Sequence, residues 1–197
     1  IADTETELTC DRTMIVLQAS GADSYDWQNG EMVVTTPGTY TVTGTNANGC
    51  SATASVEITQ NVDVPTVTIR PSADKLTCDV TAITLQASGA DSYDWQNGEM
   101  EVTTPGTYTV TGTGANGCQA ESSIEITQDI AEPVVTINAD ETELTCDRTS
   151  IVLQANGAVS YDWQNGEMVV TAPGTYTVIG TGANGCQAES SIEITQD

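Results

Sequence analysis

Six cysteines are the residues of this chain whose type and spacing could do chemistry. They recur at one fixed interval in two series: Cys10, Cys78 and Cys146 in one, and Cys50, Cys118 and Cys186 in the other. A zinc site is disfavoured, because the sequence has no histidine and no Cys-x-x-Cys pair. A catalytic cysteine or serine would also lack the histidine that usually acts as its base. Regular cysteine pairs in small repeats are instead typical of disulfides in an oxidising, extracellular compartment.

The spacing favours one disulfide within each repeat. The two cysteines of a repeat lie 40 positions apart, and the predicted bonds are Cys10–Cys50, Cys78–Cys118 and Cys146–Cys186. In the chain-entropy account, closing a loop of that length stabilises a module by about 4 kcal/mol. A bridge from Cys118 to Cys146 is the alternative. It would join neighbouring repeats and leave Cys10 and Cys186 unpaired in this chain.

Carboxylates are the second group that could do chemistry. The chain has 28 acidic and 4 basic residues, and its formal net charge is −24. This charge excludes nucleic acid as a partner, because binding a polyanion needs clustered Lys and Arg, and it disfavours an anionic membrane surface. The acidic residues recur on outward strand positions of every repeat, which indicates a solvated face rather than an acid–base pair. We therefore expect no enzymatic activity.

The linker carboxylates are the candidates for a metal site. Asp129, Glu132 and Asp140 flank the second linker, and calcium prefers several oxygen ligands of this kind. The first linker offers fewer of them, since Val64 and Ser72 stand where the second has Glu132 and Asp140. Calcium at the linkers is thus the one candidate cofactor.

The elements that must position these residues are short strands. In the middle repeat, apolar and polar residues alternate in runs such as 107–113 and 119–127, which is the period of half-buried strands. Asn97-Gly98 predicts a hairpin turn, because both residues tolerate a positive φ. About seven such strands in one repeat predict a β-sandwich or small barrel without helices. The aromatic pairs on these strands are expected in the core: Tyr25 and Trp27, Tyr93 and Trp95, and Tyr161 and Trp163.

The regular period divides the chain into three predicted domains, residues 1–61, 62–129 and 130–197. They are joined by short linkers that end in Pro65 and Pro133, and such linkers restrict the angle between neighbours. Like charges on neighbouring domains also favour an extended array over a folded-back one. Neither end has a capping sequence, so we expect further repeats on both sides. No apolar run is long enough to span a membrane.

The motifs of one repeat form a recognisable series. In the middle repeat they are Leu-Thr-Cys, Leu-Gln-Ala-Ser-Gly, Tyr-Asp-Trp-Gln-Asn-Gly, Pro-Gly-Thr-Tyr-Thr-Val, Asn-Gly-Cys and Ile-Glu-Ile-Thr-Gln. This series resembles the Ig-like, PKD-related tandem repeats of large Bacteroidota cell-surface proteins, such as the gliding-motility adhesins exported by the type IX system. The resemblance covers essentially the whole chain. It implies Ig-like sandwich domains and an extracellular, cell-surface location, and it supplies no ligand.

Together these observations predict a structural segment of an extracellular adhesin or fibre that acts as stalk or filament body. Its partners would be the neighbouring repeats of the same long chain and other copies in a fibre, without membrane insertion. An array of glycan- or protein-binding modules that works by avidity is the alternative, and near-identical repeats suit both functions. An exposed aromatic or apolar patch on the loops would favour the binding function.

Overall fold

The computed structural model is all-β over the residues that it describes, which are 5–28, 30, 32–96, 98, 100–164, 166 and 168–197. Within these ranges no helix is long and apolar enough to cross a membrane. Contacts between Cα atoms divide the chain into two compact units. The first comprises Ile1–Arg70, Gln86–Glu99 and Tyr108–Ile124, and the second comprises Pro71–Leu85, Met100–Thr107 and Glu125–Asp197. Each unit thus holds one terminal repeat and a part of the middle repeat.

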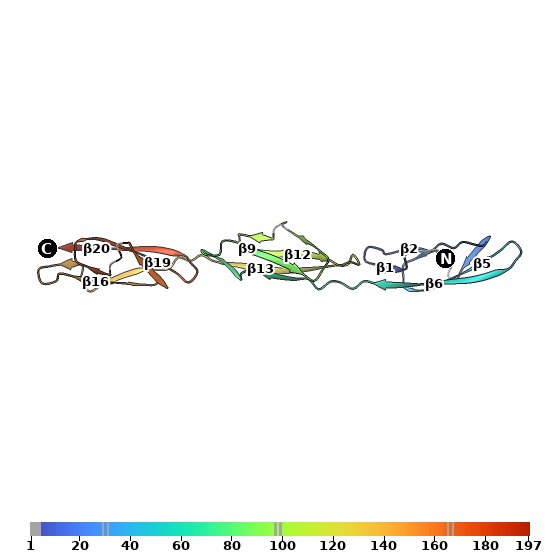
Figure 1. Cartoon of the computed structure of the whole chain (residues 1–197), viewed down its shortest axis with the longest axis horizontal. Coiled ribbons are helices and arrows are strands. Elements are labelled where there is room, and N and C mark those ends of the chain that lie inside the picture. The colour runs from blue at the N-terminus through green and yellow to red at the C-terminus, as the bar shows by residue number, and fades with distance from the viewer. Residues whose placement is uncertain are drawn as a thin grey trace. The chain divides into compact units, whose positions relative to one another are not determined.

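The first repeat forms two small sheets in the first unit, ordered β1-β6-β5-β3 and β2-β4. The strands are β1 (Glu7–Thr9), β2 (Ile15–Val16), β3 (Ser24–Trp27), β4 (Val33–Val34), β5 (Gly38–Thr45) and β6 (Ser51–Asn61). β5 and β6 form an antiparallel ladder (Figure 1), whereas β1 runs parallel to the end of β6 and pairs Thr9 with Asn61. β6 has 11 residues, so it spans the repeat from the residue after Cys50 to the outgoing linker.

The third repeat lies in the second unit and has the same long strand pair, β19 and β20 (Figure 1). Its sheets are ordered β15-β20-β19-β17 and β14-β16-β18. The strands are β14 (Thr136–Ala139), β15 (Glu143–Leu144), β16 (Ile151–Asn156), β17 (Ser160–Trp163), β18 (Val169–Val170), β19 (Gly174–Thr181) and β20 (Gln187–Gln196). The parallel pair recurs here, with Leu144 of β15 opposite Gln196 of β20.

The middle repeat contributes strands to both units. They are β7 (Thr68–Pro71), β8 (Lys75–Thr77), β9 (Ile83–Ser88), β10 (Ser92–Trp95), β11 (Glu101–Val102), β12 (Gly106–Thr113) and β13 (Gln119–Asp129). In the first unit β10 pairs with β12, and in the second unit β8 runs parallel to the end of β13. Of the predicted hairpin turn Asn97-Gly98, Asn97 lies outside the described residues.

Alternation along the strands accounts for the core. In β20, Ile194 is buried while its neighbours Glu193 and Thr195 are exposed. In the first repeat, the side chains packed between the two sheets are Leu8, Ile15, Leu17, Trp27, Val34, Val42 and Ile58. The cluster of the third repeat consists of Leu144, Ile151, Leu153, Val170 and Ile194. The predicted all-β sandwich architecture is therefore confirmed.

The aromatic residues divide between core and surface. Trp27 is a buried core residue, and Trp163 is half-buried and packs against the core of its own repeat. Tyr25 and Tyr93 are exposed, at 39% and 36%, so their predicted place in the core is wrong. Each tyrosine lies on the same face as its tryptophan, but at the end of the sheet beyond the core. There the Tyr25 hydroxyl donates to the carbonyl of Ala22 at 2.9 Å and accepts from its N–H at 2.7 Å.

Two residues of the predicted aromatic pairs remain. Trp95 is half-buried, as is Tyr161, whose hydroxyl makes the equivalent two bonds to the backbone of Ala158. Because the tyrosine hydroxyl hydrogen-bonds to the backbone of the preceding turn, the ring is held at the end of the sheet, where it is only partly covered. Tyr25, Tyr93 and Tyr161 therefore close the end of a sandwich rather than fill it.

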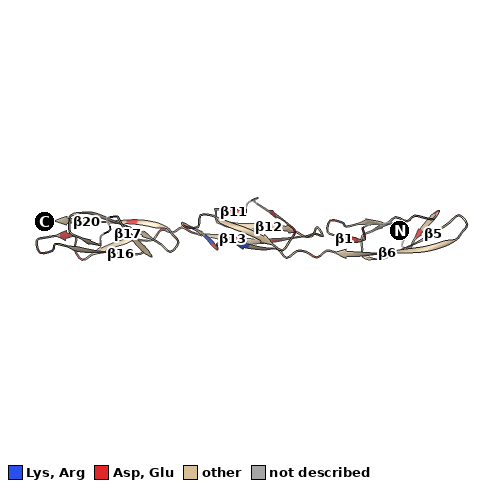
Figure 2. Cartoon of the chain, in the orientation of Figure 1, with Lys and Arg blue, Asp and Glu red and all other residues tan. Residues whose placement is uncertain are grey.

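Acidic residues (red in Figure 2) lie along the strands of all three repeats. Glu121 and Glu125 on β13 are exposed, as their outward positions predict, and no charged side chain is buried among the described residues. Three of the basic residues form surface ion pairs: Arg12 with Glu5, Lys75 with Asp129 at 3.5 Å, and Arg148 with Glu141 at 3.5 Å.

Candidate functional site at the repeat junctions

Each repeat carries a tight turn around its first cysteine, which we call the LTC turn (residues 9–12, 77–80 and 145–148). In the first repeat, the N–H of Thr9 donates to the carbonyl of Arg12 at 2.9 Å, and the Thr9 hydroxyl accepts from the N–H of Arg12 at 3.1 Å. Thr77 makes the same contacts with Val80. A threonine whose hydroxyl accepts a backbone hydrogen bond within its own turn stabilises the turn and disfavours continuation of the strand. The strand therefore ends at threonine in the first two repeats and one residue earlier, at Leu144, in the third, and the cysteine that follows the threonine is exposed in all three.

Each repeat also carries a loop around its second cysteine, which we call the NGC loop (residues 46–50, 114–118 and 182–186). The loop closes because the N–H of Gly114 donates to the carbonyl of Cys118 at 2.9 Å, and the N–H of Gly117 donates to the carbonyl of Gly114 at 2.9 Å. Gly117 has a φ of 75°, a conformation that favours glycine. The Asn116 carbonyl Oδ1 accepts from the N–H of Cys118 at 3.1 Å, which fixes the cysteine at the start of the long strand.

Disulfides join the LTC turn of one repeat to the NGC loop of the next. Cys10 bonds to Cys118, and Cys78 bonds to Cys186; in both bridges the Cα atoms are 5.0 Å apart and the cysteines lie 108 residues apart in sequence. Both partners of each bridge belong to one compact unit. Cys50 and Cys146 are free and exposed.

The predicted bridges within repeats, Cys10–Cys50, Cys78–Cys118 and Cys146–Cys186, are therefore wrong, and so is the alternative bridge from Cys118 to Cys146. The physical reason is the length of the last strand. Cys50 directly precedes β6, whereas Cys10 directly follows Thr9, which pairs with Asn61 at the other end of β6. An 11-residue strand is about 35 Å long, and a disulfide needs Cα atoms within about 7 Å.

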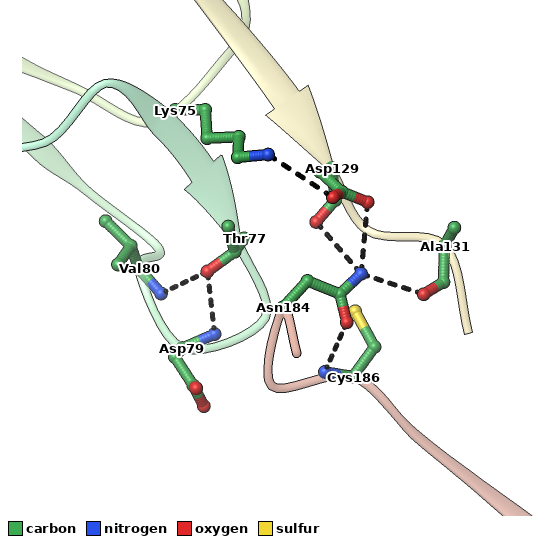
Figure 3. Close-up of polar contacts among 8 residues, drawn as sticks. All are labelled: Lys75, Thr77, Asp79, Val80, Asp129, Ala131, Asn184 and Cys186. Carbon is green, nitrogen blue, oxygen red and sulfur yellow. Dashed lines mark hydrogen bonds and ion pairs between the residues drawn. The ribbon is translucent and has the colours of Figure 1, made fainter. Parts of the chain in front are cut away.

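An asparagine side chain clamps each junction next to its disulfide. In the second unit, Nδ2 of Asn184 donates to a carboxylate oxygen of Asp129 at 3.1 Å and to the carbonyl of Ala131 at 2.8 Å (Figure 3). Its backbone carbonyl accepts from the N–H of Cys78 at 3.1 Å. The amide thus binds the linker of the preceding repeat, and the backbone of the same residue binds the preceding LTC turn.

The first junction has the same clamp, except that the side chain of Asn61 is the acceptor in place of the Asp129 carboxylate. Nδ2 of Asn116 donates to Oδ1 of Asn61 at 3.0 Å and to the carbonyl of Asp63 at 2.9 Å, and the Asn116 carbonyl accepts from the N–H of Cys10 at 3.1 Å. From the sequence, this asparagine is recognisable only as the first residue of the Asn-Gly-Cys motif. Its recurrence in all three repeats, two residues before a cysteine, was the signal that it has a further role.

Close approach of the LTC turn explains the glycine of the NGC loop. A Cβ placed on Gly117 would lie 2.0 Å from the carboxyl carbon of Asp11, and one on Gly185 would lie 2.0 Å from that of Asp79. Glycine therefore serves two purposes here, a positive φ and room for the carboxylate of the preceding repeat.

The stability of the second junction depends on pH through the carboxyl group of Asp129. The hydrogen bond from Asn184 is the main cause that lowers the pKa of Asp129, with smaller contributions from the Ala131 backbone and from Lys75. A carboxyl whose pKa is lowered by folding stabilises the folded state above its unfolded pKa, and this contribution is lost as the pH falls through the folded pKa. Below about pH 4, the second junction should therefore weaken.

This pH dependence predicts a specific effect of Asp129→Asn. The difference in urea midpoint between the wild-type protein and the variant should change as the pH falls from about 6 to 3, in the direction of lost wild-type stability. Asn61→Asp is the complementary variant, because it places a carboxyl beside Asn116 in the first junction, where Glu7 stands in place of Lys75, so the added dependence should be smaller there. A difference that stays constant over this pH range would contradict the role of Asp129.

The structure does not gather the calcium candidates into one site. Asp129 faces Asn184 and Lys75, and among the described residues no group of three or more acidic side chains or cysteines could hold a metal ion. Asp129, Glu132 and Asp140 thus do not form a metal site in this structure. The junction is built on an amide clamp and a disulfide instead.

No protein-family profile matches the chain, and no curated protein matches its sequence. Among solved structures, it is similar to a Ca²⁺-stabilised adhesin that helps an Antarctic bacterium reach out and bind ice, with 16% identity, a TM-score of 0.48 and 88% of this chain covered. The match spans 65% of that chain, which is less than two thirds of its length.

Two further solved structures are similar to this chain. Extracellular domains 3–5 of Drosophila OTK show 14% identity and a TM-score of 0.33, with 82% of this chain and 71% of that chain covered. A protocadherin gammaB7 EC3–6 structure shows 17% identity and a TM-score of 0.29, with 94% and 66% covered. All three TM-scores are below 0.5.

Proposed function

We propose that this chain is a structural repeat segment of an extracellular surface adhesin or fibre. Its three Ig-like domains, residues 1–61, 62–129 and 130–197, act as a stalk or filament body. The observation that carries this proposal is the placement of both disulfides, each of which bonds one repeat to the next rather than closing a repeat on itself. A bond in that position resists separation of neighbouring repeats, which is what a stalk or fibre requires.

The long strands support a mechanical role. β13 begins directly after Cys118, and it ends at Asp129, the residue that Asn184 clamps. The same strand therefore connects the disulfide of one junction to the linker of the other. Tension that enters the middle repeat through its disulfide passes along one strand to the next junction, without crossing the sheet.

Several observations support an extracellular location and a non-enzymatic role. Disulfides persist in oxidising compartments, and the net charge of −24 favours solubility. The resemblance to Bacteroidota surface repeats, including gliding-motility adhesins, points to the same class of parent protein. Among the described residues, the exposed aromatics are single tyrosines whose hydroxyls bond to the backbone of their own turns.

Small-angle X-ray scattering tests the stalk proposal. Three domains in a row, each about 35 Å long, would span about 100 Å and give a radius of gyration of about 30 Å, against about 16 Å for a compact chain of this length. Because covalent junctions rather than charge should hold the row, the value should change little between low and high salt. A radius of gyration near the compact value would contradict the stalk. A value that collapses at high salt would show that repulsion, not the junction, keeps the domains apart.

A further inference from the structure

The junction clamp depends on an asparagine that is followed directly by glycine. Asn116 and Asn184 hold the preceding linker with their side-chain amides, and the glycines after them leave room for an aspartate of the preceding LTC turn. The junction therefore needs both residues of the pair. Asn-Gly is also the pair most prone to deamidation, because glycine has no Cβ to keep its backbone nitrogen away from the asparagine side chain.

The NGC loop itself activates the asparagine side chain for this reaction. The N–H of Cys118 donates to Oδ1 of Asn116 at 3.1 Å, and the N–H of Cys186 donates to Oδ1 of Asn184 at 3.2 Å. A donor at this oxygen stabilises the negative charge that develops there when a nucleophile attacks the amide carbon. Donor and acceptor belong to the same loop, so this bond does not require contact with the preceding repeat.

The closed junction opposes deamidation at the two nitrogens that must react. The attacking nitrogen, that of Gly117, must lose its proton, but its N–H donates to the carbonyl of Gly114 at 2.9 Å. The leaving nitrogen, Nδ2 of Asn116, must gain a proton, but it faces two acceptors, Oδ1 of Asn61 at 3.0 Å and the carbonyl of Asp63 at 2.9 Å. Both acceptors belong to the preceding linker, so this second restraint ends when the junction opens.

We propose that Asn116 and Asn184 are deamidation sites that are protected while their junction is closed and that react once it opens. The nitrogen of the following glycine attacks Cγ of the asparagine, the Cγ–Nδ2 bond breaks, and ammonia leaves. Water then opens the resulting succinimide ring at either carbonyl, which gives aspartate or isoaspartate. The reaction consumes one water molecule and releases one ammonia, so it needs no oxidant. It concerns the chemistry of the junction and can fail while the stalk proposal stands.

The product of deamidation does not fit the second junction. The partners of Asn184 Nδ2 are acceptors, a carboxylate oxygen of Asp129 at 3.1 Å and the carbonyl of Ala131 at 2.8 Å (Figure 3). An aspartate at this position sets two carboxylates against each other and leaves the carbonyl without its donor. At the first junction the acceptor is the amide of Asn61, which can turn its own NH2 group toward a carboxylate. Deamidation therefore damages the second junction more than the first.

Peptide mapping of protein incubated for weeks in neutral buffer tests the proposal on a matched pair of sites. Residues 114–123 and 182–191 have identical sequences, so their asparagines share one intrinsic rate of deamidation. Cys10→Ser removes the bridge beside Asn116. Cys78→Ser removes the bridge beside Asn184. Each variant should accelerate deamidation at its own site about tenfold or more and leave the other site within about twofold, because reaction through an open state follows the population of that state.

The reduced chain unfolded in urea gives the unprotected rate and keeps the test independent of how well the variants fold. In the intact oxidised chain, Asn116 and Asn184 should react at least about a hundredfold more slowly than in the unfolded chain. Equal rates in the two states, or variants that accelerate both sites alike, would overturn the proposal. Three further Asn-Gly pairs in identical Trp-Gln-Asn-Gly-Glu-Met sequences serve as references for the incubation: Asn29, Asn97 and Asn165.

Asn184→Asp places the product of the reaction directly in the clamp. It should lower the urea midpoint of the oxidised protein more than Asn184→Ala does, because repulsion from Asp129 is added to the loss of the donor. Asn116→Asp is the matched variant and should lower the midpoint less, because the Asn61 amide can donate to the new carboxylate. A midpoint of Asn184→Asp equal to that of the unaltered chain would overturn the damage proposed for the second junction.

Discussion

Stretched from its two ends, the oxidised chain should reach a contour length of only about 210 Å, against about 690 Å after reduction, at about 3.5 Å for each fully extended residue step. The shortest covalent route through both disulfides uses three stretches, Ile1–Cys10, Cys78–Cys118 and Cys186–Asp197, which together contain roughly 60 such steps. The reduced chain must extend through all 197 residues. Single-molecule force spectroscopy with and without a thiol reductant measures both lengths.

Variants that remove one bridge sharpen this prediction. Cys10→Ser leaves only Cys78–Cys186, and Cys78→Ser leaves only Cys10–Cys118; either way the route lengthens to roughly 90 residue steps, or about 310 Å. Three bridges within repeats would instead give about 270 Å for the unaltered chain. A contour length near that value, or one that reduction does not change, would contradict the junction disulfides.

The two overlapping loops explain why this arrangement suits a load-bearing chain. The cysteines of each bridge are 108 residues apart, and the first loop contains Cys78 while the second contains Cys118. No repeat can therefore unfold and extend to its full length by itself. A bridge closed within a repeat would protect only that repeat and would leave the linker to hold the neighbours together.

The strands were predictable because their signal is local. Alternation of apolar and polar residues in 119–129 places Ile126 inside and Glu125 outside whatever the rest of the chain does. The tyrosines show the limit of that signal. Period two puts Tyr25 on the face of Trp27, but only the three-dimensional end of the sandwich decides that the core stops between them.

The disulfide pairing was not predictable, because it depends on which ends of neighbouring repeats meet. Spacing shows that Cys10 and Cys50 are close in sequence, yet β6 separates them by its full length. The bonded partner, Cys118, is 108 residues away and becomes close only when one repeat docks on the next. The same reasoning applies to Asn184, because its hydrogen-bond acceptors, Asp129 and Ala131, belong to the preceding linker.

Loss of one junction disulfide should lower the free energy of unfolding by about 5 kcal/mol, the value that the chain-entropy account gives for a loop closed over 108 residues. Cys10→Ser is the suitable change, because Cys10 is exposed while its partner Cys118 is buried, so the new hydroxyl stays in water. The parent for this comparison is the double variant Cys50→Ser/Cys146→Ser, in which no spare thiol can exchange with the one released. Urea denaturation under oxidising conditions measures the loss.

The parent itself separates the two pairing schemes. Cys50 and Cys146 are exposed and free, so their replacement by serine should change the free energy of unfolding by no more than about 0.5 kcal/mol. If bridges closed within repeats, the same double variant would break two of them, at a cost of about 4 kcal/mol for each. Cys78→Ser should match Cys10→Ser, because its bridge closes a loop of equal length. A stable parent together with two equally destabilised single variants is a result that only the junction disulfides produce.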